Sequence, residues 1–379
     1  MTGETFTAQE HFFALIRLAI GRQPASSFDG VQISWPAVYE MSKKHALLGI
    51  CFAGIEKLPE ASRPELGLLL KWIAASEHIR QDNMLADSRV LELITRLKSN
   101  GFEPILLKGR GIARLYTAPL AANSGFDSLG DLRSSGDIDV WIPQQSRKEI
   151  LNYLRSTSNS KYVVYHNAEY PIFDDVSVEI HFTPSWFWNF RRNHVFQSFC
   201  ESHVCACLAN AIDLSGVPVA VPTTDFNRVF ILQHIYRHLF GEGIGLRQLL
   251  DYYFVLLSGS AEGKEASYSV VKRLGMGKFC AAVMWIMVGV FGLDEEFLLC
   301  RPDEKAGQFL LSEVMTAGNF GQYDERDAHK KGSNSPFGRF AHHINRDLRY
   351  VHSYPGEVLC VPIWKIWHYL WRKQFTVNR

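Results

Sequence analysis

The stretch that most constrains the fold is residues 133–142, which read RSSGDIDVWI. Because side chains alternate across a strand, Asp137 and Asp139 share one face, and Ile138, Val140 and Ile142 share the other. Strands are depleted in aspartate and close carboxylates repel each other, so this pair needs compensating positive charge. Mg²⁺ prefers one or two carboxylates together with substrate phosphates. The pattern therefore indicates a strand with one buried face and one metal-binding face.

A short apolar strand and a glycine-punctuated turn precede this stretch. Residues 102–111 read FEPILLKGRG and run into a helical pattern over 112–116. Gly109 and Gly111 allow close backbone approach, and the start of the following helix presents free N–H groups. The turn therefore predicts a phosphate site with Lys108 or Arg110 as counter-charge.

A third carboxylate follows on another alternating segment. Residues 176–182 read VSVEIHF, so the apolar side chains go inward while Ser177, Glu179 and His181 share the polar face. If this strand neighbours the first one, Glu179 completes the metal site.

The order LLKG, RSSGDIDV, VEIHF resembles the nucleotidyltransferase superfamily of the DNA polymerase beta type. Within it, the chain is similar to the bacterial family labelled uncharacterised nucleotidyltransferase (the NTP_transf_5 type). In that family LKG replaces the more usual Gly-Ser pair and an arginine lies four residues before the first Asp, matching Lys108-Gly109 and Arg133. The likeness spans roughly residues 100–255 and includes a later H…LR…D pattern. The chain departs from the superfamily at Glu179, where Asp is common.

The resemblance implies metal-dependent transfer of an NMP from an NTP to a hydroxyl acceptor, with release of pyrophosphate. It implies that Asp137, Asp139 and Glu179 are the catalytic, metal-binding residues for Mg²⁺ or Mn²⁺. Glu179 completes the second metal site or accepts the proton of the acceptor hydroxyl. The residues expected to bind the nucleotide are Lys108, Gly109, Arg133, Gly136, His181 and Arg247. The acceptor, whether a small molecule, RNA or a protein, and the oligomeric state stay open.

Two rival hypotheses stay open. The first is a catalytically inactive nucleotide- or partner-binding module with the same fold. The second is a toxin-like nucleotidyltransferase directed at RNA, for which the basic stretch 326–349 would matter. Basic residues interleaved with Trp364, Trp367 and Trp371 can hold RNA or lie on an anionic membrane, although an amphipathic helix docked on the body is the simpler interpretation.

Pattern and composition together predict an α+β protein in which a small mixed β-sheet core is flanked by helical regions. The expected domains are a helical region over 1–100, a nucleotidyltransferase core over 101–185 and a second helical region over 186–379. Expected helices include 64–84, 86–100, 146–155 and 226–240, and expected strands are 162–166, 170–173 and 177–182. Residues 118–136 are predicted to form a mobile flap with Arg133 at its base. Arg247 and Asp251, four apart, are predicted to form an intrahelical ion pair.

Charge and hydropathy exclude some classes of protein. Lys+Arg 40 against Asp+Glu 39 leaves a net charge of +1, so nucleic-acid binding would need a local patch. The first residues lack a cationic region of the signal-peptide type, and the apolar run 279–293 is too short to span a membrane. We therefore expect no membrane span, a buried helix at 279–293 and a cytoplasmic location.

Overall fold

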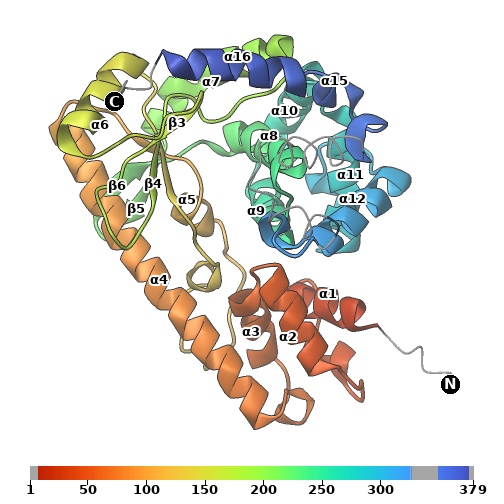
Figure 1. The fold of residues 1–379 in the computed structure, drawn as a ribbon. Coiled ribbons are helices and arrows are strands. Elements are labelled where there is room, and N and C mark those ends of the chain that lie inside the picture. Colours follow the sequence, from red (N-terminus) through yellow and green to blue (C-terminus); the bar gives the residue numbers. More distant parts are fainter. Residues whose placement is uncertain (1–6, 325, 327–348, 375–379) are drawn as a thin grey trace.

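A small mixed sheet lies between helices contributed by both ends of the chain (Figure 1). The computed structural model describes residues 7–324, 326 and 349–374. Helices predominate and the strands gather in one four-stranded sheet and one hairpin, so the predicted α+β class is confirmed.

The N-terminal helices are α1 (Ala8–Ala19), α2 (Trp35–Lys44), α3 (Leu48–Glu56) and α4 (Leu66–Ser99). Helix α4 spans 34 residues, so the prediction of separate helices over 64–84 and 86–100 is wrong. The residues around Met84 are helix formers with no glycine or proline to interrupt them. The helix ends where expected, at Gly101, whose φ of +80° only glycine adopts readily.

The main sheet has the order β1-β2-β4-β3. Its strands are β1 (Ile105–Leu106), β2 (Ile138–Trp141), β3 (Asn167–Glu169) and β4 (Val178–His181). β2 runs parallel to β4 and antiparallel to β1, while β3 and β4 are antiparallel. The register pairs Asp139 with Glu179 on the two central strands. Parallel pairing therefore places the second aspartate and the third acid side by side.

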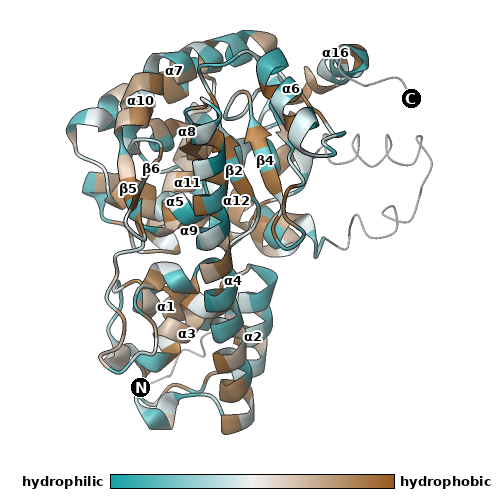
Figure 2. Cartoon of the chain, turned by 90° about the vertical axis from the view of Figure 1, so that its left-hand side faces the viewer, coloured by the Kyte–Doolittle hydropathy of each residue, from teal (hydrophilic) through white to brown (hydrophobic). Residues whose placement is uncertain are grey.

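The two faces of the sheet differ as the alternation predicts. Ile138, Val140 and Ile142 are buried in one cluster with apolar side chains of α4 and of α6 (Arg147–Thr157). Trp141, on the opposite face, stacks on Phe226 at 5.9 Å between ring centroids. The hydropathy colouring shows brown strands β2 and β4 enclosed by helices (Figure 2). The apolar face thus fixes the sheet on α4 and α6 and leaves the acidic face toward the C-terminal helices.

Two of the three strands predicted after α6 are wrong. The paired residues are Asn167–Glu169, whereas Val163 forms only an isolated bridge with Ala168 and residues 170–173 are not a strand. The polar Asn167 gave no strand signal, but β4 offers its free edge and backbone pairing overrides the side-chain preference. The third expected strand, 177–182, is confirmed as β4. Helix α6 is confirmed too, with Ser146 as its N-cap.

The C-terminal region is helical apart from a hairpin of β5 (Ala211–Leu214) and β6 (Val217–Ala220). Its helices are α7 (Phe190–Ala209), α8 (Thr224–Gly241), α9 (Leu246–Leu257), α10 (Glu262–Arg273), α11 (Gly277–Gly289), α12 (Glu304–Ala317), α15 (Pro355–Val358) and α16 (Val361–Lys373). Helices α8 and α11 confirm the helices expected at 226–240 and 279–293, and α11 is largely buried. Among the described residues, no helix is both long and apolar enough to cross a membrane.

The predicted flap over 118–136 is packed in its second half. A short 3₁₀ turn, Leu129–Leu132, follows the first part of the segment, and Leu129, Leu132 and Arg133 are buried. The Asn83 side-chain amide on α4 donates to the backbone oxygen of Arg133 at 3.0 Å. The flap prediction is therefore wrong for this half, because its leucines fill a core between α3, α4 and α5 (Arg110–Ala113).

Candidate functional site

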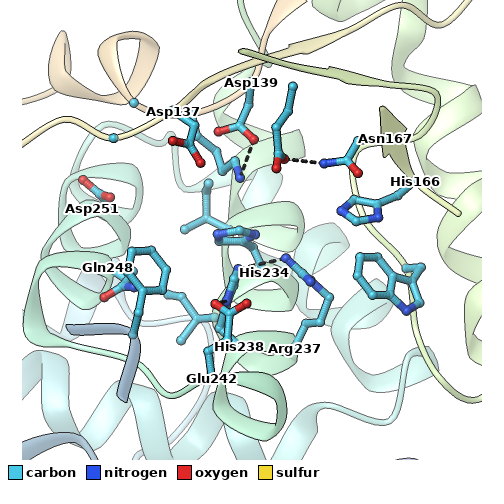
Figure 3. Close-up of a pocket in the computed structure, with 18 of the residues that line it drawn as sticks. Asp137, Asp139, His166, Asn167, His234, Arg237, His238, Glu242, Gln248 and Asp251 are labelled. Carbon is cyan, nitrogen blue, oxygen red and sulfur yellow. Dashed lines mark hydrogen bonds and ion pairs between the residues drawn. The ribbon is translucent and has the colours of Figure 1, made fainter. Parts of the chain in front are cut away.

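A cavity of about 690 Å³ opens between the acidic face of the sheet and the helices α8 and α9. Asp137, Asp139 and Glu179 lie on its sheet side, and His234, Arg237 and His238 of α8 lie on the opposite side (Figure 3). Predicted site residues that line it are Lys108, Gly109, Arg133, Gly136, Asp137, Asp139, Glu179 and Arg247. The structure thus brings these predicted residues, which span 139 positions of the chain from Lys108 to Arg247, into one cavity.

The two central strands place three donor groups together. One ligand atom each of Asp139, Glu179 and His181 lies within 4.8 Å of the others. His181 Nε2 lies 2.9 Å from Asp139 Oδ1 and 3.5 Å from Glu179 Oε2. Asn167 on β3 donates to the Glu179 carboxylate. Asp137, just before β2, makes no hydrogen bond or ion pair with any residue of the described part.

The pKa values reflect this crowding. Burial opposes protonation of His181, but its hydrogen bonds to Asp139 and Glu179 outweigh burial and raise the pKa. Burial alone would raise the pKa of Asp139, but the charge of Lys108 and the hydrogen bond from His181 lower it. Partial burial and the nearby charges of Asp139 and Glu179 raise the pKa of Asp137. Lys108 and His181 thus compensate the charge of Asp139, whereas no cation contacts the Asp137 carboxylate among the described residues.

The glycine turn stands against this acidic face. Lys108 Nζ lies 3.0 Å from Asp139 Oδ1, and Gly109 takes φ +56°, a conformation that other residues rarely adopt. The following helix α5 is only one turn long, shorter than the pattern over 112–116 suggests. Arg110 is not available as counter-charge, because Asp87 on α4 binds it with contacts of 2.7 and 2.8 Å. Lys108 is thus the cation of the turn that faces the cavity.

Two predicted arginines have different surroundings. Arg133, 3% exposed, forms a two-pronged ion pair with Asp251, with Nε–Oδ1 2.6 Å and Nη2–Oδ2 2.7 Å. The Tyr116 hydroxyl donates to the same carboxylate at 2.8 Å. The predicted pair between Arg247 and Asp251 is therefore wrong: spacing allows it, but Arg133 approaches Asp251 with better geometry.

Arg247 instead lines the cavity. Its Nη1 donates to the backbone oxygen of Ser134 at 3.0 Å, and its buried Nε has no hydrogen-bond partner. Burial, reinforced by the neighbouring charge of Arg133, lowers the pKa of Arg247 to about 10. At neutral pH this is still a cation, and an anion in the cavity would stabilise it.

Two cavity-lining residues at the C-terminal end of α8, Arg237 and Glu242, were not predicted from the sequence. Arg237 Nη2 donates to His238 Nε2 at 2.8 Å, so the proton of His238 lies on Nδ1, which faces Glu242 Oε2 at 3.0 Å. Burial, together with the charge of Arg237, lowers the pKa of His238 to about 4. The signal in the sequence was a set of polar residues at i, i+3, i+4 and i+8, namely His234, Arg237, His238 and the C-cap Glu242, which share one face of the helix.

Aromatic residues form the remaining wall. Trp186 is 8% exposed, stacks on Trp364 of α16 at 5.6 Å and lies beneath the Arg237 guanidinium at 4.2 Å. His166 contacts the Trp186 ring at 4.0 Å, and His166 and Asn167 point toward the cavity beside Arg237 (Figure 3). Trp186 therefore forms part of the cavity wall.

The donor set fits a divalent cation. Asp137, Asp139 and Glu179 line one side of the cavity, and ligand atoms of Asp139 and Glu179 lie together with one of His181. Carboxylate oxygens of this kind suit Mg²⁺ and Mn²⁺. The unpartnered Asp137 carboxylate, with its raised pKa, is the observation that favours an added cation.

The comparison with known families agrees with this geometry. A family model described as uncharacterised nucleotidyltransferase matches residues 32–292, which include the sheet, the glycine turn and helices α8 and α9. Comparisons with curated proteins and with solved structures gave no match. The family match covers most of the chain, so this protein belongs to the uncharacterised nucleotidyltransferase family.

Proposed function

We propose that this protein transfers an NMP from an NTP to a hydroxyl acceptor and releases pyrophosphate, in a metal-dependent reaction. The observation that carries the proposal is the side-by-side placement of Asp139 and Glu179 on parallel strands, with Asp137 beside them at the cavity. Family membership supports nucleotidyl transfer in general.

The three carboxylates are the residues that would hold Mg²⁺ or Mn²⁺. A bound divalent ion would neutralise phosphate charge and polarise the oxygens of an in-line displacement. His181 and Asn167 hold Asp139 and Glu179 in place by hydrogen bonds. Their role is to fix the orientation of the two carboxylates before the nucleotide binds.

The nucleotide phosphates are proposed to lie between the glycine turn and Arg247. Gly109 and Gly136 leave backbone exposed on the cavity side, and Lys108 supplies a cation there. The Arg247 guanidinium lines the same cavity, and its planar fork suits phosphate oxygens. Arg133 acts through Asp251 as a positioning residue, because the Asp251 carboxylate binds its Nε and Nη2.

The acceptor is proposed to enter along the α8 wall. A hydroxyl there would attack the α-phosphorus, its proton would pass to Glu179, and pyrophosphate would leave. Arg237 and His234 line this side, and the His234 imidazole makes no hydrogen bond with a described residue. The acceptor is a small molecule, RNA or protein with a hydroxyl that reaches the carboxylates.

Pyrophosphate release from each of the four NTPs, with Mg²⁺ or Mn²⁺ and with or without total RNA or cell extract, tests the proposal. Asp137→Ala and Asp139→Ala should each abolish release. The exposed turn variant Asp174→Ala, which keeps the site intact, is the matched control. Release that survives loss of either cavity aspartate would refute the mechanism.

The rival hypothesis of an inactive binding module has one structural observation in its favour. Lys108 and His181 already contact Asp139 Oδ1, so part of the acidic charge is balanced without a metal. This rival predicts that NTP and metal raise the melting temperature although no pyrophosphate appears in any mixture. The transferase hypothesis predicts both effects, and both should depend on Asp137.

The RNA-directed version depends on residues 326–349, most of which lie outside the described residues. The residues at its two ends form ion pairs with acidic side chains: Arg326 binds Glu313 and Asp324, and Arg349 binds Asp324. These two arginines are therefore engaged within the fold. RNA binding that falls steeply as salt is added would support the RNA-directed hypothesis even though these two arginines are paired within the fold.

A further inference from the structure

The strand order separates the cavity into two ends. The glycine turn follows β1 at one edge of the sheet, Asp139 and Glu179 lie on the two central strands, and His166 directly precedes β3 at the other edge. Figure 3 likewise places Asp251 on one side of the cavity and His166 with Arg237 on the other. The carboxylates of the central strands therefore lie between two separate parts of one cavity.

The geometry of the reaction assigns one reactant to each end, and this inference rests on the proposed function. The attacking and leaving oxygens of a phosphoryl transfer lie roughly in line on opposite sides of the phosphorus. With the triphosphate on the glycine turn, pyrophosphate leaves toward β1, so the acceptor hydroxyl approaches from the β3 end. Its oxygen bonds to the α-phosphorus, the bond from the α-phosphorus to the oxygen shared with the β-phosphate breaks, and the hydroxyl proton passes to Glu179.

The β3 end carries a cation that no acid binds directly. Arg237 donates from Nη2 to His238 at 2.8 Å, and its guanidinium lies over the Trp186 ring at 4.2 Å. Among the described residues no carboxylate forms an ion pair with Arg237, and its Nη1 makes no hydrogen bond. Burial lowers the pKa of Arg237 despite the opposing charges of Glu242 and the sheet acids. An anion in this end of the cavity would therefore stabilise the guanidinium.

Two imidazoles add neutral donors beside this cation. His166 and His234 both line the cavity and are each 8% exposed. Neither ring makes a hydrogen bond with a described residue, although buried polar groups normally have a partner. Burial and nearby positive charge lower the pKa of both rings, so at neutral pH each is uncharged and carries one N–H. Such donors, together with a guanidinium, suit the oxygens of a phosphate or carboxylate.

The walls around these donors are aromatic and enclosed. Trp186 and Trp364 are 8% and 7% exposed and stack at 5.6 Å, and Trp367 contacts Tyr165 at 5.5 Å between ring centroids. These contacts confirm the expectation that the tryptophan helix, α16, docks on the body. Walls so closely packed suit one compact group better than a polymer backbone.

We propose that the acceptor is a small hydroxyl compound that also carries a phosphate or carboxylate group. Arg237, assisted by His166 and His234, binds this anionic group at the β3 end of the cavity. The hydroxyl of the same molecule then points toward the central carboxylates, where the α-phosphorus lies.

Calorimetric titration of the full chain with inorganic phosphate, and separately with acetate, tests the proposal. The chain is first saturated with Mg²⁺ and a non-hydrolysable NTP analogue, so that the glycine-turn end is filled. We expect at least one of the two anions to bind this complex. Arg237→Gln removes the charge but keeps a donor for His238, and it should weaken that binding at least about tenfold. Arg237→Lys, which keeps the charge, should weaken it less.

Two other arginines supply the controls. Arg80→Gln changes an arginine of α4 that pairs with Glu77 outside the cavity, and it should bind the anion as the wild type does. Arg247→Gln should weaken binding of the NTP analogue, whereas Arg237→Gln should leave it unchanged. Unchanged analogue binding also shows that the Arg237→Gln variant is folded.

The same titrations separate this proposal from the proposed function. A wild type that binds the analogue but neither anion refutes the acceptor proposal and leaves the proposed function standing. A wild type that binds no analogue refutes the proposed function, while phosphate binding that depends on Arg237 in the nucleotide-free chain still supports the anion site.

Three further results would overturn the proposal. The first is equal binding of the anion by the wild type and Arg237→Gln. The second is weaker binding of the NTP analogue by Arg237→Gln, which would assign Arg237 to the nucleotide. The third is a short RNA that binds through Arg237 where phosphate and acetate do not, which would assign this end of the cavity to a polymer.

Discussion

Asp251 is predicted to be a buried anchor whose loss costs the protein much of its stability. Asp251→Ala removes both oxygens that bind Arg133 and the acceptor for the Tyr116 hydroxyl. The guanidinium left behind is 3% exposed and keeps only a weak contact with the Ser134 oxygen at 3.3 Å. Arg247 is close enough to be affected by the charge of Arg133, so two cations would share the site without Asp251.

The size of the effect follows from this geometry. Removing one partner of a buried ion pair costs about 3–5 kcal/mol, because the remaining charge stays buried without compensation. Replacing both partners by apolar side chains avoids that penalty. Arg133→Met/Asp251→Leu should therefore lose less stability than Asp251→Ala alone, and Asp251→Asn should fall between them because its amide oxygen still accepts one bond.

Urea denaturation followed by circular dichroism measures these differences as shifts of the midpoint at unchanged slope. A loss below about 1 kcal/mol for Asp251→Ala, the range of a solvent-exposed pair, would refute the assignment of a buried anchor. The NTP-induced rise in melting temperature adds a test of role. If Arg133 only positions the site, Arg133→Met/Asp251→Leu should keep part of that rise.

Two further predictions concern the turn and the N-terminal helices. Gly109→Ala should destabilise the fold by about 1–3 kcal/mol, because φ +56° with ψ −116° strains any residue that has a Cβ. Gly136 has open space around it, so Gly136→Ala should change the urea midpoint little. Equal shifts of the midpoint in the two variants would contradict this prediction. Burial lowers the pKa of His45 to about 3 in the folded protein. Below about pH 6.5 His45 is therefore protonated in the unfolded chain but stays neutral in the folded chain, so the free energy of unfolding should fall as the pH drops from about 6.5 toward 3. His45→Gln should flatten this part of the pH curve and the exposed His78→Gln should not; an unchanged slope in the first variant would count against a buried neutral histidine.

Much of the fold could be predicted because its signals are local. The alternation around Asp137 and Asp139 predicted both faces of β2, and the Ser146 cap predicted the start of α6. The segmentation of α4 failed because sequence patterns show which residues form a helix better than where a long one is interrupted. The strand at Asn167 was not predicted, because its backbone pairing with β4, and not its own side chains, makes this segment a strand.

The candidate site could be predicted in part for a similar reason. The acids, the glycine turn and Lys108 all belong to short motifs with their own signal. Arg237 and Trp186 have no such motif, and their place in the cavity depends on how α8 packs against the sheet.

The sequence by itself determined which side chains share a face, because the period of a strand or helix is a property of the local backbone. It therefore placed both aspartates on one side of β2 and the tryptophans of α16 on one side of that helix. The tertiary structure decided the partners of the charged groups. Asp251 binds Arg133, which is 118 residues away in the chain, and not Arg247, which is four residues away. Buried charges pair with whichever opposite charge the packing brings into hydrogen-bond geometry.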